Sequence, residues 1–301
     1  MPTWTSWPAR SAGALPRSRI RSRRRAGRSA DLPERSAPVG VFDSGVGGLS
    51  VIKALVERLP HEDYIYLGDT ARLPYGTKAK STIVRFSIEN AEFLLSKGVK
   101  LIVVACNSAS ATALDALRAR FDVPIVGVIR PGAEAAVQAT TSGSIGVIGT
   151  EATINSGCYE QEILRLRPGA HVLGKPCPLF VPLVEEGWLD DPITRQVAER
   201  YLSAFRAPRV DVLILGCTHY PLLAGVIADV VGPQTAIVDS ASTVAAAVEG
   251  LLLRMSLAND TNSPGTHRFY VTDLPAKVKR IGRMFLGIDD LSIELVRLGS
   301  N

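Results

Sequence analysis

Two segments of the chain repeat one pattern, in which a run of aliphatic residues ends in a cysteine and small polar residues follow. The first is VKLIVVACNS at residues 99–108, and the second is VDVLILGCTH at residues 210–219. Such aliphatic runs are typical of strands buried in a parallel sheet, and ligands of open α/β sheets bind beyond the carboxyl ends of the strands. The sequence therefore predicts that two similar halves each bring one thiol, Cys106 and Cys217, to a ligand-binding edge.

The repeat extends to the start of each half. Residues 39–42 are strand-like and lead into Asp43 and Ser44, just as residues 145–148 lead into Gly149 and Thr150. Strand-like and helix-like segments alternate elsewhere, which favours parallel sheets with right-handed crossovers. We expect an α/β protein with two similar doubly wound parallel-sheet domains, related by a pseudo-twofold axis, and an active site in the cleft between them.

The expected domain limits follow from this repeat. The domain that carries Cys106 is expected at residues 38–131 plus 240–301, and the domain that carries Cys217 at residues 132–239. Amphipathic spacing predicts helices within both, for example over residues 81–97 and 155–166. Ser81 is the expected N-cap of the first of these helices, and Gly98 is expected to end it.

The charge of the chain is concentrated at its N-terminus. Residues 1–37 contain nine arginines and two acidic residues, a net charge of +7, which leaves −2 for the remainder. This Arg-rich extension has few apolar residues, so we expect it to be disordered. One interpretation is that the extension is inert or results from a start site assigned too early. The other is that it is an anion-binding arm or a targeting signal. The slightly acidic remainder does not suggest a nucleic-acid groove, and no apolar stretch reaches the ~18 residues of a membrane span.

The four cysteines favour free thiols in a reducing cytoplasm. They form no C-x-x-C pair, and the chain is long enough to fold without disulfides. Cys217 and His219 alone make a poor zinc signature, so we expect no metal. We interpret Cys158 and Cys177 as structural.

Two thiols that face each other could remove a proton from one side of a carbon and return one to the other side. The alternative is that each cysteine is simply a small apolar residue at the end of a buried strand. His219 follows Cys217 closely, so it could stabilise a thiolate or move a proton; alternatively it is a hydrogen-bonded core residue.

The glycine-rich segment 43–48 follows the first strand. It lacks the lysine of a P-loop and the G-x-G-x-x-G spacing of a dinucleotide site. A turn that holds a small anion, such as a carboxylate, through backbone N–H groups and the Ser44 hydroxyl is the better interpretation. Asp43 would pair with an ammonium group or tune a thiol, unless it is a helix N-cap. Tyr75 belongs to a turn and could line a pocket.

Five segments together resemble the cofactor-independent glutamate racemases of the aspartate/glutamate racemase superfamily. They are GVFDSGVGGLS (40–50), LGDTARLPYG (67–76), VACNSAS (104–110), CPLFVPLVEEG (177–187) and LGCTHYPLL (215–223). The family usually has threonine where this chain has Ser108, which keeps the hydroxyl. The Arg-rich extension departs from the family.

The resemblance implies a role for each matching residue. Cys106 and Cys217 would be the two catalytic acid/bases. Asp43, Asp69, Glu185 and His219 would support them as acid/base or electrostatic residues, with Glu185 preferred over its neighbour Glu186. Substrate contacts would come from Asp43, Ser44, Tyr75, Gly76, Asn107, Ser108, Thr218 and His219.

The resemblance also implies an activity, the interconversion of L- and D-glutamate without a cofactor, which supplies D-glutamate for peptidoglycan. The expected partners are the two glutamate enantiomers and a second copy of the chain, a homodimer, and neither a membrane nor nucleic acid. Three alternatives stay open: a racemase of aspartate or a related amino acid, an inhibitor of DNA gyrase that uses the Arg-rich extension, and a redox role for the thiols.

Overall fold

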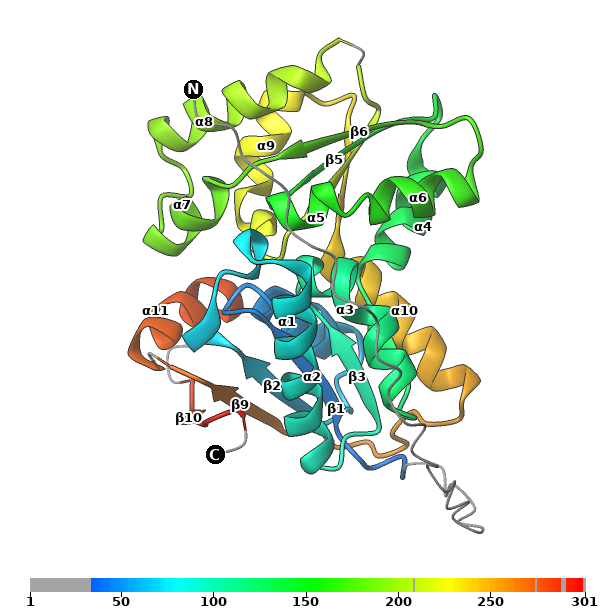
Figure 1. Ribbon diagram of the computed structural model, residues 1–301, viewed down its shortest axis with the longest axis vertical. Helices are drawn as coiled ribbons and strands as arrows, with labels where there is room; N and C mark the ends of the chain where they lie inside the picture. The colour runs from blue at the N-terminus through cyan, green and yellow to red at the C-terminus, as the bar shows by residue number, and fades with distance from the viewer. Residues whose placement is uncertain (1–33, 208, 274, 288–290, 300–301) are drawn as a thin grey trace, which may run out of the picture. The chain divides into compact units, whose positions relative to one another are not determined.

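The computed structural model of the protein describes residues 34–207, 209–273, 275–287 and 291–299 (Figure 1). Most of the Arg-rich extension, residues 1–33, lies outside the described residues, and so does its expected disorder. Residues 34–37 form a turn against the body of the protein. The Arg35 side chain pairs with Asp260, and the Arg35 backbone carbonyl accepts a hydrogen bond from the buried Lys100. The body therefore begins slightly before the expected residue 38.

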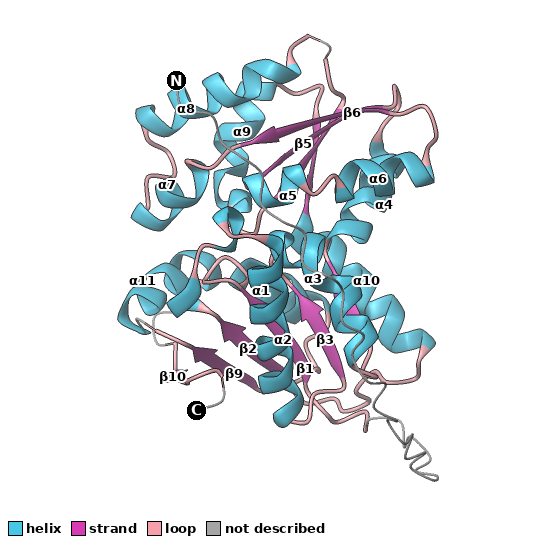
Figure 2. Ribbon diagram, in the orientation of Figure 1, coloured by secondary structure: helices cyan, strands magenta, loops and turns pink. Residues whose placement is uncertain are grey.

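Two parallel sheets organise the described chain, and helices flank each of them (Figure 2). The first sheet has the order β10-β9-β2-β1-β3-β4 and the second β6-β5-β7-β8. Four strands of the first sheet, in the order β2-β1-β3-β4, thus have the same arrangement as the whole second sheet. The strands are β1 (Val39–Asp43), β2 (Tyr64–Gly68), β3 (Leu101–Val104), β4 (Ile125–Gly127), β5 (Ser144–Gly149), β6 (His171–Pro176), β7 (Val212–Gly216), β8 (Ala236–Asp239), β9 (His267–Val271) and β10 (Ile293–Leu295).

Helices connect successive strands, as parallel pairing requires. The α-helices are α1 (Leu49–Arg58), α2 (Lys80–Ser96), α3 (Asn107–Arg120), α4 (Ile129–Ala139), α5 (Glu151–Asn155), α6 (Cys158–Leu166), α7 (Phe180–Glu186), α8 (Pro192–Leu202), α9 (Ala224–Val231), α10 (Ser240–Arg254) and α11 (Pro275–Leu286). Short 3-10 turns occur at Thr70–Arg72 (η1), Tyr75–Thr77 (η2), Ser203–Phe205 (η3) and Tyr220–Leu223 (η4).

Alternation along the first three strands explains why helices cover both faces of the first sheet. In β3, Leu101 and Val103 belong to one apolar cluster, while Ile102 and Val104 belong to the other. Successive strand residues point to opposite faces, so a fully apolar strand needs apolar partners on both sides.

Two packed helices carry the chain between the sheets. Helix α4 leads from β4 to β5, α10 leads back from β8 towards β9, and the two helices contact each other (Figure 1). The domain boundary expected after residue 131 falls inside α4, and the domain boundary expected after residue 239 coincides with the start of α10.

Local details differ from expectation at two helices. The helix expected over residues 155–166 begins three residues later, as α6 at Cys158, because Gly157 adopts a φ of +67° and separates it from α5, which ends at Asn155. Helix α2 begins after Ala79, so Ser81 lies inside its first turn and is not the N-cap. Gly98 follows the last helical residues with a φ of +75°, a conformation that favours glycine.

Within the described ranges, no helix combines the length and the apolar character needed to cross a membrane.

Candidate active site

Cys106 and Cys217 follow equivalent strands and line one cavity. Cys106 lies two residues beyond the end of β3, and Cys217 comes directly after β7. The volume of this central cavity is about 30 Å³. It is lined by Ser44, Gly45, Leu73, Pro74, Tyr75, Gly76, Cys106, Asn107, Ser108, Thr150, Val181, Glu185, Cys217, Thr218 and His219. The two thiols and most of the residues singled out from the sequence are therefore brought together.

The Cys106 thiol is shielded from solvent. The side chain is buried, and its Sγ lies 3.5 Å from the Ser44 hydroxyl oxygen. Burial, followed by the negative charge of Asp43, raises the pKa of Cys106 to about 12, although hydrogen bonding with Ser44 and with the backbone of Ala109 opposes the rise. In this state of the cavity Cys106 is a neutral thiol at neutral pH.

The second thiol lies beside an imidazole. His219 Nδ1 is 3.9 Å from Cys217 Sγ, and His219 Nε2 is 3.4 Å from Glu185 Oε1. Burial lowers the pKa of His219, but its contacts with Cys217 and Glu185 and the charge of Asp43 outweigh this effect and raise the pKa to about 10. Glu186 is exposed, so Glu185 is the glutamate at the site.

Asp43 lies behind the cavity wall. Its carboxylate accepts hydrogen bonds from the Gly45 backbone at 2.9 Å and from the Thr218 hydroxyl at 3.4 Å. Helix α1 begins after Gly48, so Asp43 is not its N-cap. Asp43 is fully buried, and this burial raises its pKa. The carboxylate thereby connects the turn after β1 with the segment after β7.

Asn107 and Ser108 occupy the first turn of α3, at the edge of the cavity. The Asn107 side-chain oxygen accepts a hydrogen bond from Tyr159 at 2.8 Å, whereas its buried Nδ2 has no hydrogen-bond partner among the described residues. The Ser108 hydroxyl lies 2.9 Å from that of Thr150. The cavity thus contains an amide donor and hydroxyl groups from both halves.

Sequence reasoning assigned no role to four residues that line this cavity, Leu73, Pro74, Thr150 and Val181. A signal for Thr150 was present, since the repeat aligns the end of β5 with the end of β1 and therefore Thr150 with Ser44. Val181 carried no comparable signal, because α7 lies in a proline-rich segment for which no helix was expected.

Asp69 does not line the cavity, although Tyr75 and Gly76 do. It follows β2, is fully buried, and holds the hydroxyl of Tyr75 and the guanidinium of Arg72. Asp69 therefore reaches the cavity only through another side chain.

The other two cysteines lie outside the cavity. Cys177 is fully buried, and the half-buried Cys158 donates a hydrogen bond to the Ala111 carbonyl at 3.0 Å. Across the described part of the chain, no three His, Cys, Asp or Glu side chains are grouped so as to hold a metal ion.

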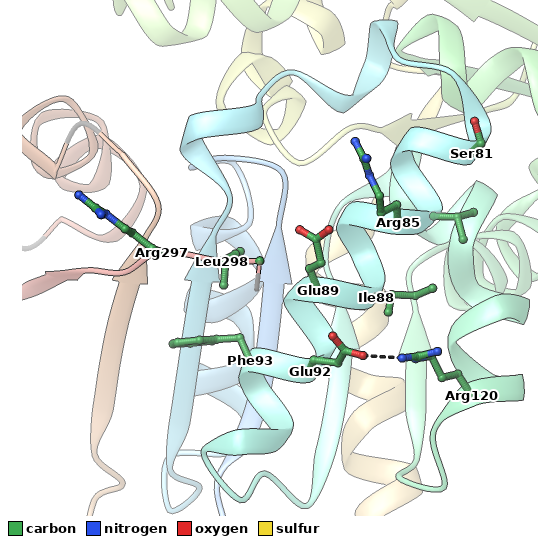
Figure 3. Close-up of a pocket in the computed structure, with 11 residues that line it drawn as sticks. Ser81, Arg85, Ile88, Glu89, Glu92, Phe93, Arg120, Arg297 and Leu298 are labelled. Carbon is green, nitrogen blue, oxygen red and sulfur yellow. Dashed lines mark hydrogen bonds and ion pairs between the residues drawn. The ribbon is translucent and has the colours of Figure 1, made fainter. Parts of the chain in front are cut away.

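A larger hollow of about 570 Å³ lies between α2 and the C-terminal segment (Figure 3). We call it the outer hollow. Its acidic side chains are paired, Glu92 with Arg120 and Glu89 with Arg72. None of the residues expected at the active site lines it.

The raised pKa of Cys106 predicts slow alkylation. The thiolate is the reactive form, so the rate of modification by iodoacetamide should rise about tenfold per pH unit between pH 7 and pH 10, without a plateau. Mass spectrometry of the peptide that carries Cys106 measures this rate. The same peptide in urea-unfolded protein is the control, where the rate should level off above about pH 8.5. A plateau near that pH in the folded protein would contradict the prediction.

Comparisons with known proteins agree with this geometry. Residues 39–248 match the family model described as Asp/Glu/Hydantoin racemase. The chain is 51% identical over 249 residues to a glutamate racemase of Geobacter metallireducens, which covers 83% of this chain and 92% of that protein. It is 49% identical over 261 residues to a glutamate racemase of Syntrophus aciditrophicus, which covers 87% of this chain and 97% of the relative.

Solved structures show the same two-sheet architecture. The glutamate racemase of Francisella tularensis in complex with D-glutamate superposes with a TM-score of 0.82 at 40% identity, over 87% of this chain and 98% of the other. Isoform RacE1 from Bacillus anthracis superposes with a TM-score of 0.85 at 37% identity, over 88% and 98% of the two chains. The family model spans most of the chain, and close relatives match nearly their full length, so the chain belongs to the Asp/Glu/hydantoin racemase family.

Proposed function

We propose that this protein interconverts L- and D-glutamate by a two-thiol mechanism. One observation carries the proposal: Cys106 and Cys217, from equivalent strands of two similar halves, line a single cavity. The names of the close relatives support glutamate as the substrate, as does the D-glutamate bound to the Francisella relative.

In this mechanism one thiolate removes the proton from Cα, and the opposite thiol donates its proton to the other face. The first sulfur ends as a thiol and the second as a thiolate, so the reverse reaction begins from the other side. A Cα proton is far less acidic than a thiol, so the carbanionic charge needs stabilisation. Hydrogen-bond donors aimed at the substrate carboxylate, such as Asn107 Nδ2 and the hydroxyls of Ser44, Ser108 and Thr218, would provide it.

The ionisable residues would adjust the two thiols. A substrate ammonium beside Cys106, with Asp43 behind the cavity wall, brings a positive charge that lowers the pKa of both groups, which favours a thiolate once glutamate is bound. On the other side, a protonated His219 held by Glu185 would stabilise the Cys217 thiolate. Tyr75 and Gly76 would contact the substrate from the turn of η2.

The size of the cavity implies movement. About 30 Å³ holds only one or two water molecules, so its walls must separate before an amino acid enters. We propose that residues 38–131 plus 240–301 form one domain and residues 132–239 the other, and that they close over glutamate. Closure would exclude water and strengthen each polar contact.

The test is the turnover of purified enantiomers. Circular dichroism should show that L-glutamate and D-glutamate each convert to the racemate without added cofactor, and that aspartate is converted at least about tenfold more slowly. Faster turnover of aspartate would contradict glutamate as the substrate and favour the related racemase. Rescue of a bacterium that requires D-glutamate would test whether the protein supplies D-glutamate for peptidoglycan. Sedimentation of the purified protein would test whether it is a homodimer. Fractionation of the source cells would test whether it is cytoplasmic.

A further inference from the structure

Asp69 lies at the centre of a buried hydrogen-bond network beside the central cavity. Its carboxylate accepts hydrogen bonds from Arg72 Nε at 2.8 Å, from the Thr272 hydroxyl at 3.1 Å and from the Tyr75 hydroxyl. The side chain is fully buried, and both oxygens are engaged by these donors. A carboxylate held in this way is poorly placed to exchange a proton with a substrate.

Tyr75 connects this network to the cavity. Its hydroxyl donates to Asp69 and accepts a hydrogen bond from Asn90 Nδ2 at 3.1 Å, and its ring packs on Phe86. Tyr75 is the first residue of η2, and both Tyr75 and Gly76 line the cavity. The contact between Asp69 and Tyr75 therefore links the buried network to the turn that lines the cavity.

The network continues to the protein surface. Arg72 pairs with Glu89, donates to Asn90 Oδ1 at 3.3 Å and lies 4.1 Å from the centre of the Phe86 ring. Glu89 is on α2, lines the outer hollow and is 24% exposed (Figure 3). Contacts thus run from Glu89 through Arg72 and Asp69 to Tyr75.

We propose that Asp69 is a positioning residue that fixes the turn Tyr75–Thr77 against the substrate through the Tyr75 hydroxyl, and that Arg72 and Glu89 act through Asp69. This inference rests on the proposed function and gives Asp69 a different role from the acid/base role expected from the sequence. The phenol proton of Tyr75 is held by Asp69, so the turn exchanges no proton with the substrate. In this proposal the turn holds the substrate equally in the ground state and the transition state, so the loss of its contacts raises KM while kcat is preserved.

Steady-state kinetics with both glutamate enantiomers test this role. Asp69→Asn and Tyr75→Phe should each raise KM about tenfold, and Glu89→Gln about threefold, with kcat changed less than about twofold. The pH profile of kcat/KM should keep both limbs in all three variants. The double variant Tyr75→Phe with Glu89→Gln should have the KM of Tyr75→Phe alone, because the network is already interrupted.

Two matched variants serve as controls. Tyr64 is also a buried tyrosine, but its hydroxyl donates to the carbonyls of Leu55 and Leu59 at the other end of β2, so Tyr64→Phe should leave KM unchanged. Glu92 lies one turn beyond Glu89 on α2 and pairs with Arg120 (Figure 3), so Glu92→Gln should also leave KM unchanged.

Two results would overturn the inference. One is a large fall in kcat for Asp69→Asn with the loss of one pH limb, which would make Asp69 an acid/base group. The other is a wild-type KM in both Tyr75→Phe and Glu89→Gln, and this result decides the question even if Asp69→Asn does not fold. A wild-type enzyme that does not racemise glutamate would instead contradict the proposed function.

Discussion

Replacing Cys106 or Cys217 by alanine should lower the rate of full racemisation by about 10³-fold, the contribution expected of a positioned acid/base group. Each variant keeps one sulfur, so it can act on one face of Cα but has no proton donor on the other. Circular dichroism measures how fast each variant removes the optical activity of a pure glutamate enantiomer. Incorporation of solvent deuterium at Cα, followed for each enantiomer separately, shows which face each remaining thiol serves.

The chain offers a matched control for these variants. Cys158 is half-buried, lies outside the central cavity and donates its hydrogen bond to a backbone carbonyl, so Cys158→Ala should keep the wild-type rate. Full activity in both Cys106→Ala and Cys217→Ala would refute the two-thiol mechanism. An equal loss in Cys158→Ala would mean that the assay reports folding instead of chemistry.

Gly47→Ala should lower kcat/KM by about 100-fold, the cost expected when reacting groups are displaced by about 1 Å. An added Cβ would lie 2.3 Å from Thr218 Oγ1 and 2.5 Å from His219 Nδ1. Both distances are too short, and His219 is itself held between Cys217 and Glu185, so the segment after β7 must shift. Steady-state kinetics on both glutamate enantiomers measure the effect.

Two other glycines show whether the loss comes from this contact. An added Cβ at Gly45, in the same turn, would come no closer than 3.6 Å to a Leu73 side-chain atom, so Gly45→Ala should lower kcat/KM far less than Gly47→Ala. Gly225 in α9 has open space around it, and Gly225→Ala should raise the free energy of unfolding by about 0.5–1 kcal/mol. Wild-type kinetics for Gly47→Ala would show that the segment after β7 tolerates displacement.

Much of the architecture was predictable because it depends on local periodicity. The aliphatic runs before Cys106 and Cys217 predicted parallel strands, and β3 and β7 are indeed the third strands of two equivalent sheets. Periodicity did not predict helices α4 and α9 or the break at Gly157 between α5 and α6, because these features depend on how the chain turns between sheets and packs.

The candidate site divides in the same way. Short motifs identified Cys106, Asn107, Cys217 and His219, because each lies within three residues of a strand's carboxyl end, where ligands of α/β sheets bind. Asp69 belongs to such a motif too, yet its carboxylate contacts Tyr75 and Arg72 and does not line the cavity. A motif specifies a residue type and a place along the chain, whereas the direction of a side chain depends on its neighbours in space.

The amino-acid sequence by itself determined that two similar α/β halves each end a buried strand in a thiol, because hydrophobic periodicity and residue spacing are local properties of the chain. Only the tertiary structure decided that both thiols line one small cavity, that burial raises the pKa of Cys106 while contacts with Cys217 and Glu185 raise that of His219, and that Asp69 contacts Tyr75 without lining the cavity. These features arise from burial and from contacts between residues as far apart in the chain as Asp43 and Thr218, and no local pattern encodes such contacts.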